Sequence, residues 1–167
     1  MSIAMKRFFI LLAALVMAGS CAQAETVIDH GEAVARCALT LAQRAECPVD
    51  EQLLQAACRL HDMARTCPDH ARAGAEVLRQ EGFEVLADIV ARHHDLLSNA
   101  CTEAQLLFLA DKLVQGTQPV SLEQRFAASR AKCRAGEALE NWQHRREQAR
   151  QVIRALHLSL SEDEEIV

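Results

Sequence analysis

Residues 56–65, AACRLHDMAR, carry the pattern on which the interpretation of this sequence depends. They extend a run in which core-type positions recur at spacings of three, four and three: Leu54, Ala57, His61 and Ala64. This spacing places the four side chains on one face of an α-helix. Since the face is otherwise apolar, His61 is predicted to point into the core, with Asp62 at the edge of the same face.

The same three- and four-residue spacing recurs on both sides of this stretch and predicts an all-α fold of about six to seven helices. The expected helices span residues 29–45, a segment from 50 through 64, 69–82, 83–97, 102–116, 121–133 and 137–158. Their predicted start signals are an N-cap at Asp50 and capping boxes at Thr102 with Gln105 and at Ser121 with Gln124. No segment alternates with period two over a useful length, so no strand is expected.

The composition fits one compact helical domain. The chain has 167 residues, of which half are apolar and a quarter charged, with only 6 Gly and 3 Pro. That length suffices for one hydrophobic core and makes two domains unnecessary. The formal net charge is −5 and no dense cluster of Lys and Arg is present, so a nucleic-acid partner is not expected. The acidic tail, residues 161–167, is expected to fray.

The first 24 residues have the layout of a secretory signal peptide. Lys6 and Arg7 precede an apolar run of 11 residues, 8–18, and the small-residue tripeptide 22–24 follows. Crossing a bilayer takes about 20 apolar residues, so a lasting transmembrane helix is disfavoured. We therefore predict cleavage after Ala24, a mature domain over residues 25–160 followed by the tail, and export to the periplasm of a bacterium.

Two other outcomes remain open for this segment. Cys21 follows three small residues, as in a bacterial lipoprotein cleavage box, and lipidation there would attach the protein to a membrane. If the segment is not cleaved, or translation starts later, the protein stays in the cytoplasm.

Outside Cys21 the chain has six cysteines: Cys37, Cys47, Cys58, Cys67, Cys101 and Cys133. An even number in an exported chain permits disulfides but does not fix their pairing. Cys37 and Cys58 occupy apolar helix positions and are predicted to be buried free thiols. The better disulfide candidates fall near helix starts: Cys47, Cys67 and Cys101.

Ionisable residues recur at inward positions on five consecutive predicted helices. The set comprises His30, His61 with Asp62, His70, His93 and Asp111. Burying one such residue is common, but burying six on converging faces is costly unless a partner satisfies imidazoles and carboxylates together. A divalent cation is that partner, so the sequence predicts a metal site.

These residues resemble, in type and order, the HD superfamily of metal-dependent phosphohydrolases. The likeness is carried by His30, residues 56–65, His70, His93 and the triplet 110–112, ADK, and it extends over about residues 29–126. It is greatest to HD domains fused to molybdenum-cofactor-type nucleotidyltransferases, and more distant to the bis(5′-nucleosyl)-tetraphosphatase branch. The resemblance implies an all-α HD domain.

The resemblance also implies a set of ligands for one or two divalent transition metals, with Fe, Mn and Zn not distinguished. One metal would be held by His30, His61, Asp62 and Asp111. A second would be held by His70 and His93, with Asp62 bridging the two.

Further residues near these ligands are expected to take part. Asp62, Arg65 and Lys112 are the expected catalytic residues. The side chains of Arg65 and Lys112 could hold phosphate oxygens and neutralise the charge of the transition state. His94 and Asp95 are either partners that orient an imidazole or exposed side chains.

The predicted function is therefore hydrolysis of a phosphoester or phosphoanhydride in a nucleotide or other small phosphate compound. Two alternatives stay open: a non-catalytic HD module that binds metal or ligand, and a di-iron HD-type oxygenase. The oligomeric state is not predicted.

A structural zinc site is a competing interpretation. Cys58 with His61 and Cys67 with His70 form two C-x-x-H pairs that could bind one zinc ion. It leaves the remaining inward ionisable residues without a function. The sequence contains no P-loop, nucleophile elbow or HExxH motif, so no motif supports a kinase, a serine hydrolase or a metalloprotease.

Overall fold

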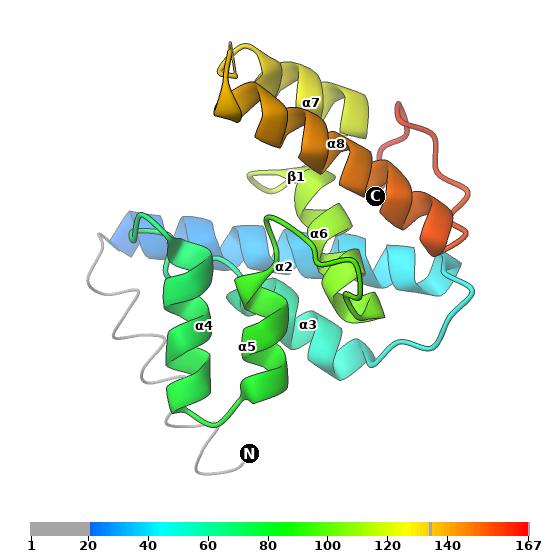
Figure 1. Ribbon diagram of the computed structural model, residues 1–167. Helices are drawn as coiled ribbons and strands as arrows, with labels where there is room; N and C mark the ends of the chain where they lie inside the picture. Colours follow the sequence, from blue (N-terminus) through cyan, green and yellow to red (C-terminus); the bar gives the residue numbers. More distant parts are fainter. Residues whose placement is uncertain (1–20, 134, 167) are drawn as a thin grey trace.

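The protein is all-α, as predicted. A computed structural model of the chain describes residues 21–133 and 135–166, with side chains from residue 26 onward. The helices in this part are α2 (Cys21–Arg44), α3 (Glu51–Leu60), α4 (His70–Gln80), α5 (Glu84–Ala91), α6 (Thr102–Lys112), α7 (Leu122–Arg130) and α8 (Glu137–Ala155) (Figure 1). A two-stranded antiparallel hairpin of β1 (Val114–Gln115) and β2 (Gln118–Pro119) follows α6.

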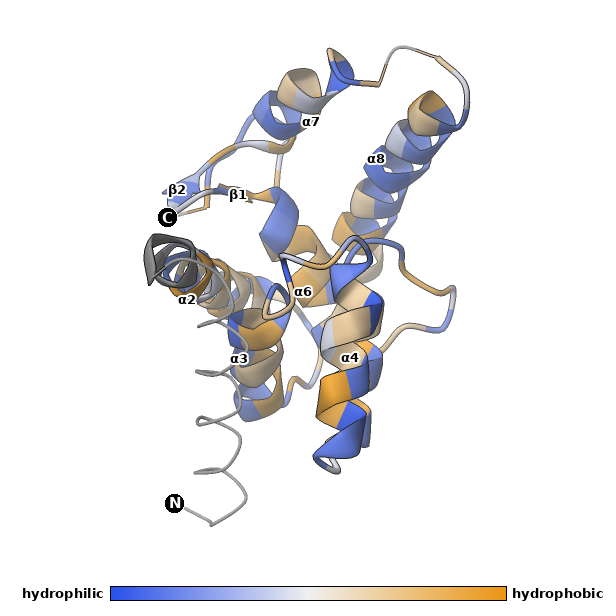
Figure 2. Ribbon diagram, turned by 90° about the vertical axis from the view of Figure 1, so that its left-hand side faces the viewer, coloured by the Kyte–Doolittle hydropathy of each residue, from blue (hydrophilic) through white to orange (hydrophobic). Residues whose placement is uncertain are grey.

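Helix α6 is the centre of the packing. It contacts α2, α3, α5, α8 and β1, and its residues from Leu106 to Lys112 are all buried. Figure 2 shows this helix largely in the apolar colours, whereas α8 on the outside is mostly hydrophilic. A helix that is apolar on all sides is expected in the middle of a core. The other helices pack as pairs around it, α2 with α3, α4 with α5 and α7 with α8 (Figure 1).

The predicted helix starts are mostly confirmed. Asp50 accepts a hydrogen bond from the backbone N–H of Leu53 at 3.0 Å, and Ser121 with Gln124 forms a complete capping box. The predicted capping box at Thr102 is wrong, because the N-cap residue is Cys101 and its side chain makes no capping bond. Gln105 instead donates its side-chain N–H to the backbone oxygen of Ala100 at 2.8 Å.

Helices α3 and α5 end before the positions that the sequence pattern predicts. Helix α3 ends at Leu60, and α5 ends at Ala91 rather than continuing to residue 97. The backbone then continues in tight turns, with Arg65 N–H donating to Asp62 O and Arg92 N–H to Ile89 O. As a result Leu97, which the pattern places in the last turn of the predicted helix 83–97, lies on a loop and is 49% exposed.

The prediction for residues 114–116 is wrong. The helix expected over 102–116 ends at Lys112, and the residues after it form a hairpin although no strand was expected. The hairpin 114–119 turns at Gly116, whose φ of +63° is a conformation that favours glycine. The tail does not fray over residues 161–166, because Glu162 pairs with Arg146 and Arg150 of α8 and Ile166 is buried. Glu162 and Glu164 of the tail thus pair with arginines of α8 and α2.

Cys37 and Cys58 are buried free thiols, as predicted. Burial raises the pKa of the Cys37 thiol to about 12 and raises that of Cys58 as well. The predicted disulfide candidates, Cys47, Cys67 and Cys101, are free thiols in the described part of the chain.

The predicted signal peptide lies almost wholly outside the described residues. Only the backbone of residues 21–24 is described, as the start of α2, so the lipidation prediction at Cys21 also falls outside the described side chains. Among the described residues, no helix combines the length and hydropathy needed to cross a membrane.

The close packing of α2 on α3 depends on Gly31. A Cβ at this position would lie 3.0 Å from the backbone oxygen of Arg59 and 3.1 Å from its Cα. Since backbone atoms cannot yield as a flexible side chain does, we expect Gly31→Ala to lower the free energy of unfolding by about 1–3 kcal/mol. Urea denaturation measures this change.

Gly74→Ala is the matched control for that prediction. A Cβ at Gly74 would meet the flexible Met63 side chain at 3.2 Å, and alanine favours the helix by up to about 1 kcal/mol. We therefore expect little net change in Gly74→Ala. Equal stability of Gly31→Ala and the wild type would show that the α2–α3 contact tolerates a methyl group.

Candidate metal centre

The structure brings the six predicted ligands together. His30 comes from α2, His61 and Asp62 from the turn after α3, His70 from the start of α4, His93 from the turn after α5 and Asp111 from α6. All are buried except His70, whose side chain is 22% exposed. Residues separated by up to 81 positions thus meet in one place.

Backbone carbonyls orient three of the histidine rings. The Nδ1 atoms of His30, His61 and His93 lie 2.6, 2.7 and 2.7 Å from the carbonyl oxygens of Gly116, Cys58 and Val90 respectively. A carbonyl can only accept, so each Nδ1 carries the proton and donates it. In the neutral ring the lone pair is then on Nε2, which faces the centre of the cluster.

Asp62 lies between two groups of imidazoles. Its Oδ2 is 3.9 Å from His30 Nε2 and 3.7 Å from His61 Nε2, whereas its Oδ1 is 3.1 Å from His70 Nε2 and 3.8 Å from His93 Nε2. The two oxygens of one carboxylate therefore face different pairs of histidines.

Asp111 completes the first of these groups. Its Oδ1 lies 3.4 Å from His30 Nε2 and 3.6 Å from His61 Nε2. Its other oxygen, Oδ2, accepts a hydrogen bond from Lys112 Nζ at 2.7 Å. One oxygen is thus used to hold the side chain, and the other points to the histidines.

Two of the inward nitrogens have no hydrogen-bond partner in the described part of the chain. They are His61 Nε2 and His93 Nε2, both fully buried. An unpaired buried acceptor is costly, and a metal ion would satisfy both atoms. Three groups of these side chains bring their ligand atoms within 4.8 Å of one another: His30 with His61 and Asp111, His61 with Asp62 and His93, and His70 with His93 and His94.

The charges at the centre favour the ligand forms of these side chains. Burial raises the pKa of Asp62, but the hydrogen bond from His70 and the positive charges of His61 and Arg65 outweigh it and hold the pKa well below its usual range. For Asp111, burial is outweighed by Lys112, His30 and His61, so its pKa is also lowered. Burial lowers the pKa of His93 to about 3. Near neutral pH the carboxylates are ionised and His93 is neutral, as metal binding requires.

The raised pKa of His61 shows that the carboxylates of the centre favour a positive charge beside them. Burial lowers its pKa, but the negative charges of Asp111, 3.6 Å away, and of Asp62 outweigh burial and raise it. The same two carboxylates would favour a bound cation at the same point.

His94 joins the cluster more closely than the sequence indicated. Its Nε2 lies 2.9 Å from His70 Nε2, its ring centroid lies 4.0 Å from that of His93, and burial lowers its pKa to about 4. In a continuous helix His94 would point about 100° away from His93. Helix α5 instead ends at Ala91, and the turn that follows brings both rings to one side. The dipeptide His93-His94 was the available signal. Asp95 points elsewhere and pairs with Arg145.

The two expected catalytic cations differ in their surroundings. Arg65 contacts Asp62 through Nη1, and its side chain is 59% exposed. Lys112 is buried, with Nζ on Asp111 and 4.7 Å from the centroid of the Phe108 ring. Arg65 can therefore reach a molecule that approaches from solvent, whereas Lys112 is positioned to hold Asp111.

The competing zinc site finds no support in this geometry. Among the described residues, the groups whose ligand atoms converge contain histidines and aspartates but no cysteine.

Three comparisons with known proteins were informative to different degrees, and the family model bears directly on this centre. Over 108 residues the chain is 32% identical to the tRNA (cytidine(56)-2′-O)-methyltransferase of Picrophilus torridus, an alignment that covers 62% of this chain and 30% of that protein. No solved structure matches the chain significantly. A family model described as the HD domain matches residues 27–115, more than half of the chain and the whole of the candidate centre. The chain belongs to the HD domain family, whose members are generally metal-dependent phosphohydrolases.

Proposed function

We propose that this protein is a metal-dependent phosphohydrolase that cleaves a phosphoester or phosphoanhydride in a small phosphate compound, such as a nucleotide. The observation that carries the proposal is the position of Asp62, whose two carboxylate oxygens face two separate pairs of imidazoles. A carboxylate shared in this way suits a pair of divalent cations.

His30, His61, Asp62 and Asp111 would hold one metal, and His70 and His93 would hold a second with Asp62 shared. His94 lies beside the second group and is a further candidate ligand. Imidazole and carboxylate donors together suit iron, manganese and zinc. When bound, such metals lower the pKa of a water molecule and polarise a phosphoryl oxygen.

The protein's own groups would position the substrate at the open side of the centre. His70 and His94 are partly exposed, and the side chain of Arg65 is 59% exposed. The guanidinium group of Arg65 can donate two parallel hydrogen bonds to phosphate oxygens, which fixes the orientation of the phosphoryl group and offsets its charge. Lys112 would act indirectly, by keeping Asp111 Oδ1 directed at His30 and His61.

The proposed substrate is small, and nucleic acid is not proposed. The net charge of −5 opposes the binding of a long polyanion. Methyl transfer to tRNA, the activity named for the relative, is not proposed, because the shared segment is 30% of that protein. We further propose that the protein works after export, as the leader-like residues 1–24 suggest.

Removal and return of metal test the proposed function. We expect the purified chain to contain transition metal by mass spectrometry and to release phosphate from one or more compounds in a panel of nucleotides and sugar phosphates. Chelation should lower that rate by at least about 100-fold, since the nucleophile and the charge stabilisation are both lost, and Mn²⁺, Fe²⁺ or Zn²⁺ should restore it.

The other outcomes separate the alternatives. Metal without hydrolysis of any compound would favour a non-catalytic binding module, and stoichiometric iron with oxygen consumption would favour an oxygenase. No metal after reconstitution with all three ions would overturn the metal centre itself.

A further inference from the structure

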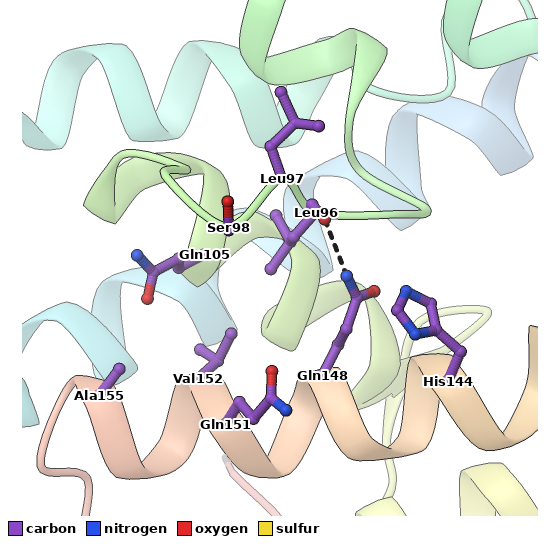
Figure 3. Close-up of a pocket in the computed structure, with 9 residues that line it drawn as sticks. All are labelled: Leu96, Leu97, Ser98, Gln105, His144, Gln148, Gln151, Val152 and Ala155. Atoms are coloured by element: carbon purple, nitrogen blue, oxygen red, sulfur yellow. Dashed lines mark hydrogen bonds between the residues drawn. The ribbon is translucent and has the colours of Figure 1, made fainter.

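A concave site lies at the segment that follows His93 and His94 in the chain. It is a pocket of ≈ 310 Å³ between the middle of α8 and the segment from Leu96 to Gln105 (Figure 3). Its volume is at the lower end of the range for ligand pockets, about 300 Å³. None of the side chains of the proposed metal centre lines it.

The pocket contains a buried amide oxygen without a partner. Gln148 is 8% exposed, and its Nε2 donates a hydrogen bond to the backbone oxygen of Leu96 at 2.8 Å. That bond fixes the orientation of the amide, because the Leu96 oxygen can only accept. The Oε1 atom is therefore turned to the opposite side, where it has no hydrogen-bond partner among the described residues. An unpaired buried acceptor costs about 1–3 kcal/mol, so the site lacks a donor.

The rest of the lining defines the donor's chemistry. Leu96, Val152 and Ala155 supply apolar surface, and none of the lining residues is Lys, Arg, Asp or Glu. A charged group would lose its hydration there, and His144, the one ionisable lining residue, is exposed and therefore a weak counter-charge. Gln105 already donates an amide N–H to Ala100 O, so its amide oxygen is the atom that remains to accept a hydrogen bond from a ligand. The pocket thus suits an uncharged molecule with an apolar body and an N–H group.

Access to the Gln148 oxygen involves His144. Figure 3 shows the amide end of Gln148 directed toward the His144 ring, which extends from the next turn of α8. His144 is exposed, so its side chain can rotate at little cost and uncover the oxygen.

We propose that this pocket binds a small uncharged molecule that presents an N–H donor on an apolar body, of the carboxamide or neutral nitrogen-heterocycle type, with the N–H bonded to Gln148 Oε1. The site is independent of the proposed hydrolysis. It is nevertheless close to the candidate centre in the chain, since Asp95 follows His94 and is held to α8 by a two-point pair with Arg145 at 2.8 and 2.9 Å.

Three matched probes test the chemistry of the pocket by titration of the ¹⁵N-labelled full chain, with amide shifts as the readout. Benzamide should shift the backbone amides of Leu96, Leu97 and Val152. N,N-dimethylbenzamide lacks the N–H and benzoate carries a charge, so each should bind at least about tenfold more weakly. Equal affinity for benzamide and its dimethyl analogue, or no benzamide shift at these residues up to its solubility limit, overturns the proposal.

Variants test the assigned residue. Gln148→Met keeps the side-chain size but removes the acceptor, so benzamide affinity should fall at least about tenfold. Gln143→Met, at an exposed position on the same helix, is the control and should bind as the wild type does. Ala155→Trp, at an exposed lining position, should block benzamide without disturbing the core, which covers the case in which Gln148→Met does not fold. Unchanged binding in Ala155→Trp overturns the proposed location.

Discussion

Asp62→Ala is expected to release bound metal and to lower phosphate release by at least about 1,000-fold. No other described side chain faces both pairs of imidazoles, with Oδ1 3.1 Å from His70 Nε2 and Oδ2 3.7 Å from His61 Nε2. Removing the carboxylate takes one ligand from each proposed metal and leaves the exposed Arg65 without its anchor. Metal content by mass spectrometry and the rate on the compound found active in the panel measure the two effects.

Asp88→Ala is the matched control for this change. Asp88 is also a helix-associated aspartate paired with an arginine, Arg79 at 2.8 Å, but its side chain is 74% exposed. It should keep the metal content and the rate of the wild type. The conservative variant Asp62→Asn keeps the shape but not the charge, and it should resemble Asp62→Ala in activity. Full activity in either Asp62 variant would contradict the proposed function.

Much of this centre was predictable because its ligands lie on helices or in the turn directly after one. The spacing that placed Leu54 and Ala57 in the core also placed His61 there, and the spacing from Ile89 to His93 did the same on the neighbouring element. The spacing of apolar residues indicates which side of a helix faces the core, but it does not show where the helix ends. Both histidines are therefore buried although each lies just beyond its helix.

The parts that the sequence did not predict depend on where helices end and on contacts between distant segments. His94 reaches His70 because α5 stops at Ala91, and the pattern of apolar residues continued past that point. The carbonyl that orients His30 belongs to Gly116, 86 residues away, in a hairpin too short to show alternation. Every residue has a backbone carbonyl, so neither composition nor residue spacing could show that the carbonyl of Gly116 binds His30.

The ordered tail is a similar case. An acidic, Pro-free run with few apolar residues has the composition of a frayed end. Its order comes from the arginines that meet it, Arg44 on α2 with Glu164 and Arg150 on α8 with Glu162, and from the burial of Ile166. Each pair joins residues whose proximity is set by the packed fold.

Lys112→Met is expected to destabilise the fold by about 3 kcal/mol, the usual cost of removing one partner of a buried ion pair. Asp111 is buried and ionised, and Lys112 Nζ is its partner at 2.7 Å. Methionine keeps an unbranched apolar side chain but removes the ammonium group, which bonds to the carboxylate and lies over the Phe108 ring. Urea denaturation measures the loss, and Lys132→Met, at an exposed position, should be close to the wild type.

The double variant Asp111→Asn/Lys112→Met decides what Lys112 does. If Lys112 stabilises the fold by neutralising Asp111, removing both charges should return a substantial part of the lost stability, because replacing both members of a buried pair is often close to neutral. Metal would still be lost, since Asp111 Oδ1 faces His30 and His61. A lysine that instead binds substrate gives the opposite pattern, in which Lys112→Met leaves stability unchanged and raises KM. The burial of Lys112 and its bond to Asp111 favour the first result, so the ADK triplet would supply one ligand and the group that holds that ligand in place.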